Sequence, residues 1–166
     1  MADRTTDFVE YVRARGPALR RTAFLLCGDW HRAEDLTQTA LIKLYKAWRR
    51  VELSGAVDAY ARQILVRTAI DESRLFFWRR EKVTAELPDL PALENGTDAA
   101  LDVRRALAAL PKRQRAVVVL RYWEDLSVQE VAGLLGCSEG TVKSQAAKGL
   151  ATLRTSLSGE LLEAGR

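Results

Sequence analysis

Apolar residues recur every three or four positions through the first half of the chain, which is the spacing of one face of an α-helix. The pattern predicts three helices: one that ends before Gly28, one over about residues 33–49, and one over about residues 57–80. Gly28 suits the C-terminal cap of the first helix, and Leu53-Ser54-Gly55 interrupts the second. In the second helix, the face expected to be buried consists of Leu36, Ala40, Leu44 and Trp48.

The second half of the chain shows the same spacing in shorter pieces. Helices are expected over residues 101–110, 112–122, 128–135 and 139–157. Pro111 ends the first of these and suits the first position of the next, while Ser127 and Ser138 suit N-caps and Gly136 a C-terminal stop. No segment alternates apolar and polar residues as a strand does. The sequence therefore predicts an all-α fold.

Residues 81–98 break the helical pattern. This segment holds Pro88, Pro91 and the turn-forming pair Asn95-Gly96, with few apolar residues. Such a composition is typical of a flexible linker. It predicts two helical domains, over residues 5–80 and 99–160, with residues 81–98 as an acidic linker between them.

The composition excludes several classes of protein. With 48% apolar residues among 166, the chain can bury a core and is not expected to be disordered as a whole. No apolar run approaches the ~18 residues that cross a bilayer, so we expect neither membrane insertion nor a secretory signal. Cys27 and Cys137 lie far apart and outside any metal-binding spacing, which is typical of reduced cysteines in a cytoplasmic protein. Because His31 is the only histidine, we expect no metal site and no cofactor.

The net charge of +4 is unevenly distributed. Residues 1–80 hold 15 Lys and Arg against 10 Asp and Glu, and residues 101–166 hold 10 against 7. Residues 81–100 hold one Lys against five acidic residues. The two basic blocks favour contact with a polyanion such as nucleic acid, although a solvated charged surface explains the excess equally well.

The strongest local motif spans residues 126–144. Two predicted helices are separated by a short turn at Gly136, and Val131 of the first is expected to face Val142 and Ala146 of the second, as in a helix-turn-helix. The outward side of the second helix carries groups that can contact base edges and phosphates in a major groove. These residues are Thr141, Lys143, Ser144, Gln145 and Lys148. A helical hairpin with a merely solvated outer side is the alternative.

The predicted helix over residues 57–80 combines arginines with aromatic residues. Aromatic rings stack on unpaired bases while arginines bind the backbone, a combination typical of single-stranded DNA binding. The arginines are Arg62, Arg67, Arg74, Arg79 and Arg80. Phe76 and Trp78 fit the hydrophobic core at least as well, so the hypothesis depends mainly on the arginines.

Three segments in this order resemble the sigma-70 superfamily, in its small extracytoplasmic-function type and the sigma-E-like subgroup of actinobacteria. The segments are Ala33–Trp48, Ala69-Ile70-Asp71 with Trp78-Arg79-Arg80, and Leu110–Tyr122 with the helix-turn-helix. The resemblance implies that residues 5–80 dock on RNA polymerase and read the minus-10 promoter element, and that residues 99–160 read the minus-35 element. It implies a specificity subunit, without catalytic residues of its own, that directs promoter recognition, DNA melting and transcription initiation.

The resemblance also implies roles for individual residues. Those that would bind polymerase are Asp35, Gln38, Thr39 and Ile42. Those that would bind the minus-10 element are Arg62, Arg67, Asp71, Arg74, Arg79 and Arg80, with a loop over Arg50–Asp58. The outward residues of the helix-turn-helix would read the minus-35 duplex. The implied partners are core RNA polymerase, through its beta-prime clamp and beta flap, promoter DNA in duplex and single-stranded form, and an anti-sigma factor.

The sequence departs from the family pattern at three places. Many relatives carry Glu where this chain has Thr39, Asn near Arg67, and Arg-Leu where it has Gln145-Ala146. A missing arginine on the recognition helix removes a phosphate contact or a guanine reader. We therefore expect minus-35 binding that is weaker or differently specified.

Two other functions compete with this interpretation. A one-component regulator of promoter DNA would use the same helix-turn-helix, but it would leave the segment Asp35–Trp48 unexplained. An enzyme would need acidic groups that converge on one substrate. Neighbouring residues such as Glu34 and Asp35 point about 100° apart on a helix, so they do not converge.

Overall fold

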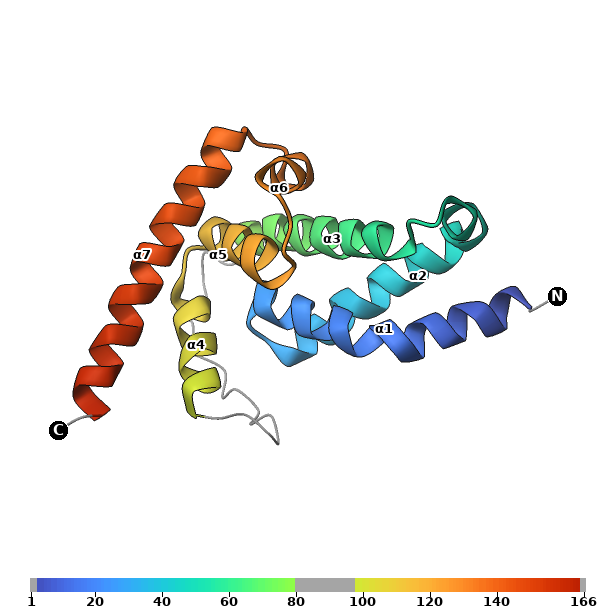
Figure 1. Ribbon diagram of the computed structural model, residues 1–166. Coiled ribbons are helices and arrows are strands. Elements are labelled where there is room, and N and C mark those ends of the chain that lie inside the picture. Colours follow the sequence, from blue (N-terminus) through green and yellow to red (C-terminus); the bar gives the residue numbers. More distant parts are fainter. Residues whose placement is uncertain (1–2, 80–97, 165–166) are drawn as a thin grey trace. The chain divides into compact units, whose positions relative to one another are not determined.

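The computed structural model describes residues 3–79 and 98–164, with side chains described for residues 3–71 and 101–159. Over these residues the chain forms seven α-helices and one π-helical turn, and no strand (Figure 1). The chain divides into two compact units, Met1–Asp89 and Leu90–Arg166. The prediction of an all-α fold with two helical domains is confirmed. The linker predicted over 81–98 lies outside the described residues except for Asp98, and the predicted domain bounds stay predictions.

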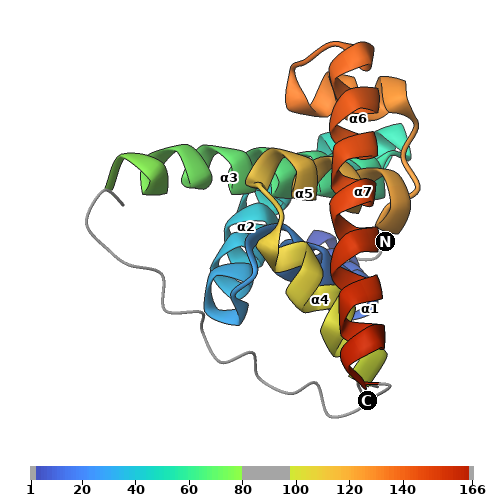
Figure 2. The same cartoon turned by 90° about the vertical axis from the view of Figure 1, so that its left-hand side faces the viewer.

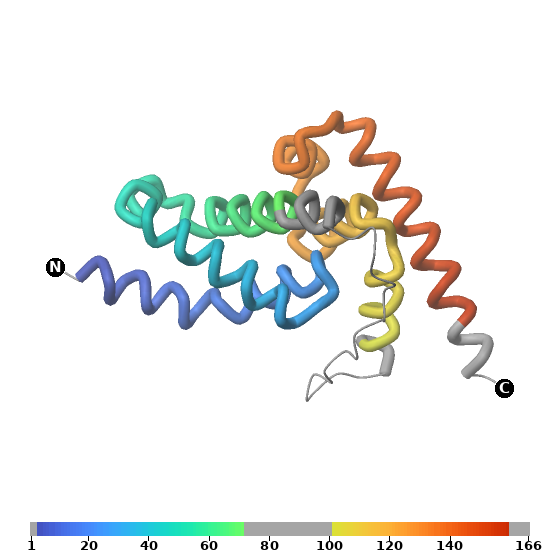
Figure 3. The backbone as a smooth tube through the Cα atoms, turned by 180° about the vertical axis from the view of Figure 1, so that it is seen from behind, coloured from blue at the N-terminus to red at the C-terminus, as the bar shows by residue number. Residues whose placement is uncertain are grey.

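The N-terminal unit consists of three helices, α1 (Arg4–Cys27), α2 (Trp30–Ser54) and α3 (Val57–Arg79). Helix α2 runs antiparallel to α1. Arg4 Nη2, near the start of α1, donates a hydrogen bond of 2.7 Å to the carbonyl oxygen of Tyr45, whereas Arg20 Nε, farther along, lies 3.3 Å from Glu34 Oε1. Figure 3 shows the three helices lying side by side from behind.

Glycine and aspartate set the boundary between α1 and α2. Gly28 has a φ of 78°, the left-handed conformation in which glycine ends a helix without steric cost. Asp29 then caps α2, because its side chain accepts a hydrogen bond of 2.8 Å from the backbone nitrogen of His31. The cap predicted at Gly28 is confirmed, and α2 starts three residues earlier than the spacing predicts.

Helix α2 is also longer at its C-terminal end than predicted. It continues to Ser54, and Gly55, with a φ of 69°, ends it. The connection to α3 is therefore only Gly55 and Ala56, and the longer loop expected over Arg50–Asp58 is wrong in extent. The reason is that Val51 faces the core and extends the apolar stripe of α2 by one more turn.

The core of the N-terminal unit forms on the face of α2 that the spacing predicts. Leu36, Ala40, Leu44 and Trp48 are all buried. Phe8 of α1 packs edge-on against the Trp48 ring, with ring centroids 5.3 Å apart, a favourable aromatic geometry. This packing holds α1 against the C-terminal half of α2.

The C-terminal unit consists of α4 (Asp98–Ala109), α5 (Lys112–Val118), a π-helical turn η1 (Val119–Trp123), α6 (Val128–Leu135) and α7 (Glu139–Ala164). The long helix α7 contacts α4, α5 and α6 in turn (Figure 2). Pro111 lies at the N-cap position of α5, with φ −53° and ψ 142°, and is not the first residue of the helix as predicted.

A π-helical turn replaces the last turn of the helix predicted over 112–122. The backbone nitrogen of Glu124 donates to the carbonyl oxygen of Val119 at 3.0 Å, five residues back. The wider turn leaves Leu120 and Leu126 buried. It leaves Tyr122 and Trp123 in solvent, 54% and 56% exposed.

Gly149 of α7 lies close against α5. It is buried, and a Cβ atom there would lie 2.7 Å from Val118 Cγ2, closer than real Cβ contacts. The two helices can therefore pack at this distance only because residue 149 has no side chain.

Candidate functional site

Helix α2 presents one polar face opposite the core. Asp35, Gln38 and Ile42 are exposed and Thr39 is half-buried, so the spacing of three and four residues brings all four to one side. We call these four residues the α2 outer face. Ile42 is 59% exposed, a large apolar side chain among polar neighbours.

The α2 outer face continues beyond the residues that the sequence indicated. Tyr45, three residues after Ile42, is also exposed, and the Arg4 guanidinium lies 4.7 Å from its ring centroid. The periodicity at residues 38, 42 and 45 could have indicated this extension.

Helix α3 carries the residues predicted to hold a single strand. Arg67 and Asp71 are exposed and Arg62 is half-buried. The side chains of Arg74 and Arg79, and all of Arg80, lie outside the described residues. The side chains of Phe76 and Trp78, for which a core position was the alternative, lie outside them too.

A contact between Arg50, near the end of α2, and Tyr60, in the first turn of α3, fixes the connection between the two helices. Arg50 Nη2 donates a hydrogen bond of 3.2 Å to the Tyr60 hydroxyl, and its guanidinium lies 5.5 Å from the centroid of the same ring. Leu53, three residues after Arg50, is 89% exposed, which the helical spacing does not indicate.

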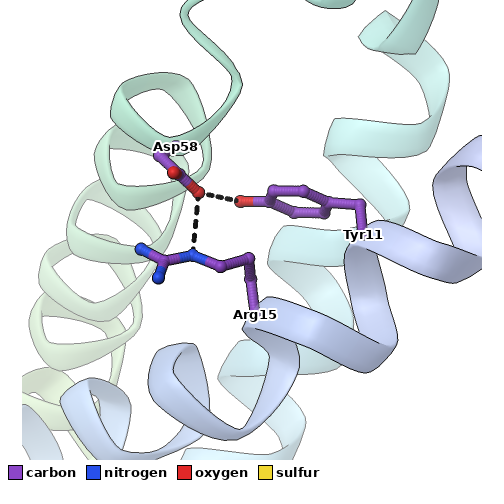
Figure 4. A network of polar contacts seen from close by, with 3 residues as sticks. All are labelled: Tyr11, Arg15 and Asp58. Carbon is purple, nitrogen blue, oxygen red and sulfur yellow. Dashed lines mark hydrogen bonds and ion pairs between the residues drawn. The ribbon is translucent and has the colours of Figure 1, made fainter.

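A second contact fixes the same connection from α1 (Figure 4). The Tyr11 hydroxyl donates to Asp58 Oδ1 at 2.9 Å, and Arg15 Nε donates to the same oxygen at 3.1 Å. Burial, and after it the hydrogen bond to Asp58, raise the pKa of Tyr11 above its ordinary value, so the hydroxyl stays protonated and donates. We call these three residues the Asp58 network. Helical spacing could not predict this network, because Tyr11 and Arg15 lie 47 and 43 residues before Asp58.

The helix-turn-helix forms as predicted. Ser127 caps α6 by accepting from the backbone nitrogen of Glu130 at 3.1 Å, and the Glu130 carboxylate accepts from the backbone nitrogen of Ser127 at 2.7 Å. Gly136 has a φ of 64° and ends α6. Val131 and Val142 are fully buried between α6 and α7.

The residues of α7 that are predicted to read DNA differ in how accessible they are to a ligand. Lys143, Ser144 and Lys148 are exposed, whereas Gln145 is half-buried. Thr141 is half-buried and its hydroxyl lies 2.9 Å from the Ser138 hydroxyl, within the cap of α7. Three of the five residues therefore face solvent, and Thr141 is engaged in capping.

Two arginines of the C-terminal unit hold backbone carbonyls. Arg115 Nη2 donates to the carbonyl oxygens of Ala108 and Leu110, at 2.9 and 3.2 Å, where α4 ends. Arg121 donates to the carbonyl oxygen of Leu126. These guanidinium groups hold the unit together where the sequence offered only positive charge.

Cys27 and Cys137 are both half-buried thiols. Cys27 Sγ donates to the carbonyl oxygen of Asp29 at 3.2 Å. Within residues 3–79 and 98–164, no three His, Cys, Asp or Glu side chains gather where they could hold a metal ion. No helix in this part of the chain combines the length and the apolar content needed to cross a bilayer.

Comparison with known proteins decides the family. A model described as sigma-70 region 2 matches residues 11–82, and one described as sigma-70, region 4 matches residues 100–153. The RNA polymerase sigma-E factor of Streptomyces coelicolor is 42% identical over 165 residues, which cover 95% of this chain and 90% of that protein. This chain belongs to the sigma-70 family. It is an RNA polymerase sigma factor of the extracytoplasmic-function type, as the motifs indicated.

More distant relatives agree with this sigma factor in type and fold. The extracytoplasmic-function sigma factor SigE of Mycolicibacterium smegmatis is 31% identical over 153 residues, 87% of this chain and 59% of that protein. The sigma factor RpoE of Bartonella quintana, solved with the anti-sigma factor NepR, matches with a TM-score of 0.74 and 26% identity over 92% of this chain and 97% of that chain. The structure of CnrH, at 20% identity and a TM-score of 0.60, shares the fold.

Proposed function

We propose that this sigma factor docks on core RNA polymerase through the α2 outer face, holds the minus-10 element with α3 and reads the minus-35 element with α7. One observation supports this most directly. The α2 outer face and the basic residues of α3 lie on the same three-helix unit, so one folded unit can bind polymerase and DNA at once. A one-component regulator has no use for such a face on α2.

The α2 outer face has the chemistry of a helix-docking surface. Asp35 and Gln38 offer oxygen acceptors and an amide donor, and Ile42 offers apolar area that is 59% exposed in the free chain. An exposed apolar residue flanked by polar groups is typical of interfaces in which a helix packs on a partner helix. We assign this face to the beta-prime clamp, with Thr39 at its edge.

The outer residues of α3 suit a single strand. Arg67 can bind phosphates, and Arg62 can bind them from a half-buried position that limits its freedom. Asp71 is suited to accept hydrogen bonds from the edges of extruded bases. Arg74, Arg79 and Arg80 continue the same helix pattern in sequence and are assigned to the same role.

The exposed residues of α7 suit a duplex. Lys143 and Lys148 are assigned to phosphates and Ser144 to a base edge, because hydroxyl groups bind bases of either type. Gln145 reaches the groove from a half-buried position. Thr141 positions the helix N-terminus through Ser138 and adds a contact at its edge.

The partners and place of action follow from these assignments. Core RNA polymerase supplies the chemistry of transcription, and this chain acts in the cytoplasm as its specificity subunit without catalysis of its own. The C-terminal unit is assigned to the beta flap in addition to DNA. The relative from Bartonella quintana was solved with an anti-sigma factor, which supports an anti-sigma partner for this chain as well.

Reconstituted transcription tests the proposal. Purified full chain is mixed with core polymerase that lacks a sigma factor and with a library of random-sequence duplexes, and run-off transcripts are sequenced. We expect transcripts that start at defined positions downstream of two shared elements, and none from core polymerase alone. A chain that binds specific duplexes by itself but never assembles with core polymerase would contradict the proposal and support the one-component regulator.

A further inference from the structure

The Asp58 network has a geometry that a surface ion pair does not need. Two donors on successive turns of α1, Tyr11 and Arg15, converge on one carboxylate oxygen in the first turn of α3, at 2.9 and 3.1 Å. A carboxylate held by donors at two heights along a helix is fixed in position and in rotation. Figure 4 shows both donors reaching Asp58 from the same helix, α1.

The Tyr11 donor is itself held in place by the core. Its ring packs at a tilted angle against Trp48, with ring centroids 5.4 Å apart, and Trp48 is buried. The hydroxyl thus projects from a packed aromatic cluster and not from a mobile surface chain. Its raised pKa keeps it a donor at any physiological pH.

Stability alone does not account for the network. The side chains of Arg15 and Asp58 are 49% and 55% exposed, and ion pairs at such exposure contribute little to folding. The residue that they fix, however, belongs to the first turn of α3, one turn before Arg62. A small rotation of this first turn changes the direction in which every outward side chain farther along α3 points.

The network also changes the role of Asp58. The family resemblance places it in a segment that holds DNA, where a carboxylate would repel phosphates. In the structure its charge is compensated by Arg15 and bound by Tyr11. Arg50 and Tyr60 tie the adjacent residues to α2, so the first turn of α3 is fixed from both neighbouring helices.

We infer that Tyr11 and Arg15 are positioning residues for promoter melting: they orient the DNA-holding face of α3 through Asp58 without touching DNA themselves. The inference rests on the proposed function of α3. It assigns a role in holding the open promoter to α1, in which the sequence indicated no contact residue.

A matched pair of substitutions tests this inference. Arg15→Gln breaks the network, and Arg20→Gln removes the same charge from the same helix by breaking the Arg20–Glu34 ion pair, whose side chains are exposed to nearly the same extent, 47% and 52%. Tyr11→Phe removes only the donating hydroxyl. Each variant is assembled with core polymerase on a promoter selected by run-off transcription with the wild-type chain, and melting is read as permanganate reactivity of unpaired thymines.

We expect Tyr11→Phe and Arg15→Gln each to lower the melted fraction at saturating DNA by about threefold or more, which is within the range of the net contribution of one hydrogen bond. Their affinity for core polymerase should equal that of the wild type, and Arg20→Gln should melt promoter normally. Combining Tyr11→Phe with Asp58→Ala should add little to the effect of Asp58→Ala alone, because the latter already removes the acceptor of the Tyr11 hydroxyl.

Two outcomes would overturn the inference. One is equal melting by Arg15→Gln, Arg20→Gln and the wild type. The other is a loss of melting that follows thermal stability or polymerase affinity across all variants, as a merely structural role would produce. If the wild-type chain itself melts no promoter with core polymerase, the proposed function fails instead, and that result is distinct from both.

Discussion

Basic residues of the C-terminal unit serve two different purposes. Lys143 and Lys148 are exposed on α7, whereas Arg115 binds carbonyl oxygens where α4 ends and Arg121 binds the Leu126 carbonyl oxygen in the loop before α6. Carbonyls at a helix end lack partners within the helix, so an arginine that reaches them stabilises the fold. Positive charge in the sequence therefore does not by itself indicate a phosphate contact.

We predict that Lys143→Gln and Lys148→Gln each weaken binding of the minus-35 duplex by holoenzyme. Each lost phosphate contact should reduce the slope of log affinity against log salt concentration by about 1, because one contact releases about one counterion. The slope is measured by titrating labelled duplex at several salt concentrations.

The control for the two lysines is Arg105→Gln, which removes one exposed charge from α4 in the same unit. It should lower affinity slightly through the overall field and leave the slope unchanged. Equal slopes for all three variants would show that the lysines do not touch phosphates.

For single residues, the sequence predicted exposure to solvent better than it predicted hydrogen-bond partners. Exposure of Asp35, Gln38 and Ile42 followed from helical spacing, because the period of an α-helix assigns each residue a side. Helical spacing did not predict the hydrogen bond between Thr141 and Ser138, because it depends on side-chain rotamers. Nor did it predict the Asp58 network, because that network depends on contacts between distant segments.

Among the elements, caps were predictable and the π-helical turn was not. Gly28, Ser127 and Gly136 act where the sequence placed them, because capping depends on residues next to the helix end. The turn at Val119–Trp123 forms because Leu120 and Leu126 are both buried in the packed unit. That condition involves tertiary packing, which local spacing does not contain.

The crossing of α5 and α7 gives a prediction at this scale. Gly149→Ala would place a methyl group 2.7 Å from Val118 Cγ2. Overpacking of this kind costs about 1–3 kcal/mol, which exceeds the roughly 1 kcal/mol that alanine gains over glycine within a helix. We expect the free energy of unfolding of the C-terminal unit to fall, measured by urea denaturation followed by circular dichroism.

Gly159→Ala on the same helix is the matched control. No atom lies within 4 Å of a Cβ built at Gly159, so only the gain in helix propensity remains. This variant should be unchanged or more stable. If Gly149→Ala were equally stable, α5 and α7 could separate without cost and the close crossing would not matter for folding.

For the whole molecule, the proposed function divides one unit into a polymerase surface and a DNA surface. We predict that Asp35→Ala combined with Gln38→Ala lowers affinity for core polymerase by about tenfold or more, the scale of losing a charge-assisted hydrogen bond. The melting temperature of the chain should stay constant, because both side chains are exposed. Affinity is measured by fluorescence anisotropy of labelled chain titrated with core enzyme.

Glu10→Ala is the control for this double variant. Glu10 is exposed on α1, so its removal changes the charge of the same unit away from α2. It should leave polymerase affinity unchanged. An affinity of the double variant equal to that of Glu10→Ala would place the clamp contact elsewhere on the chain.

Because α2 is one uninterrupted helix, it fixes the orientation of the polymerase surface relative to the connection that leads to the DNA surface on α3. One continuous helix carries both Asp35 and Arg50, so the angle between their side chains is set by residue count alone. Deleting one residue between them would keep every contacting group in the chain but turn one set against the other by about 100°. The same rotation would turn part of the buried stripe formed by Leu36, Ala40, Leu44 and Trp48 away from the core, so the fold of the unit and the orientation of its two surfaces depend on the same residue count.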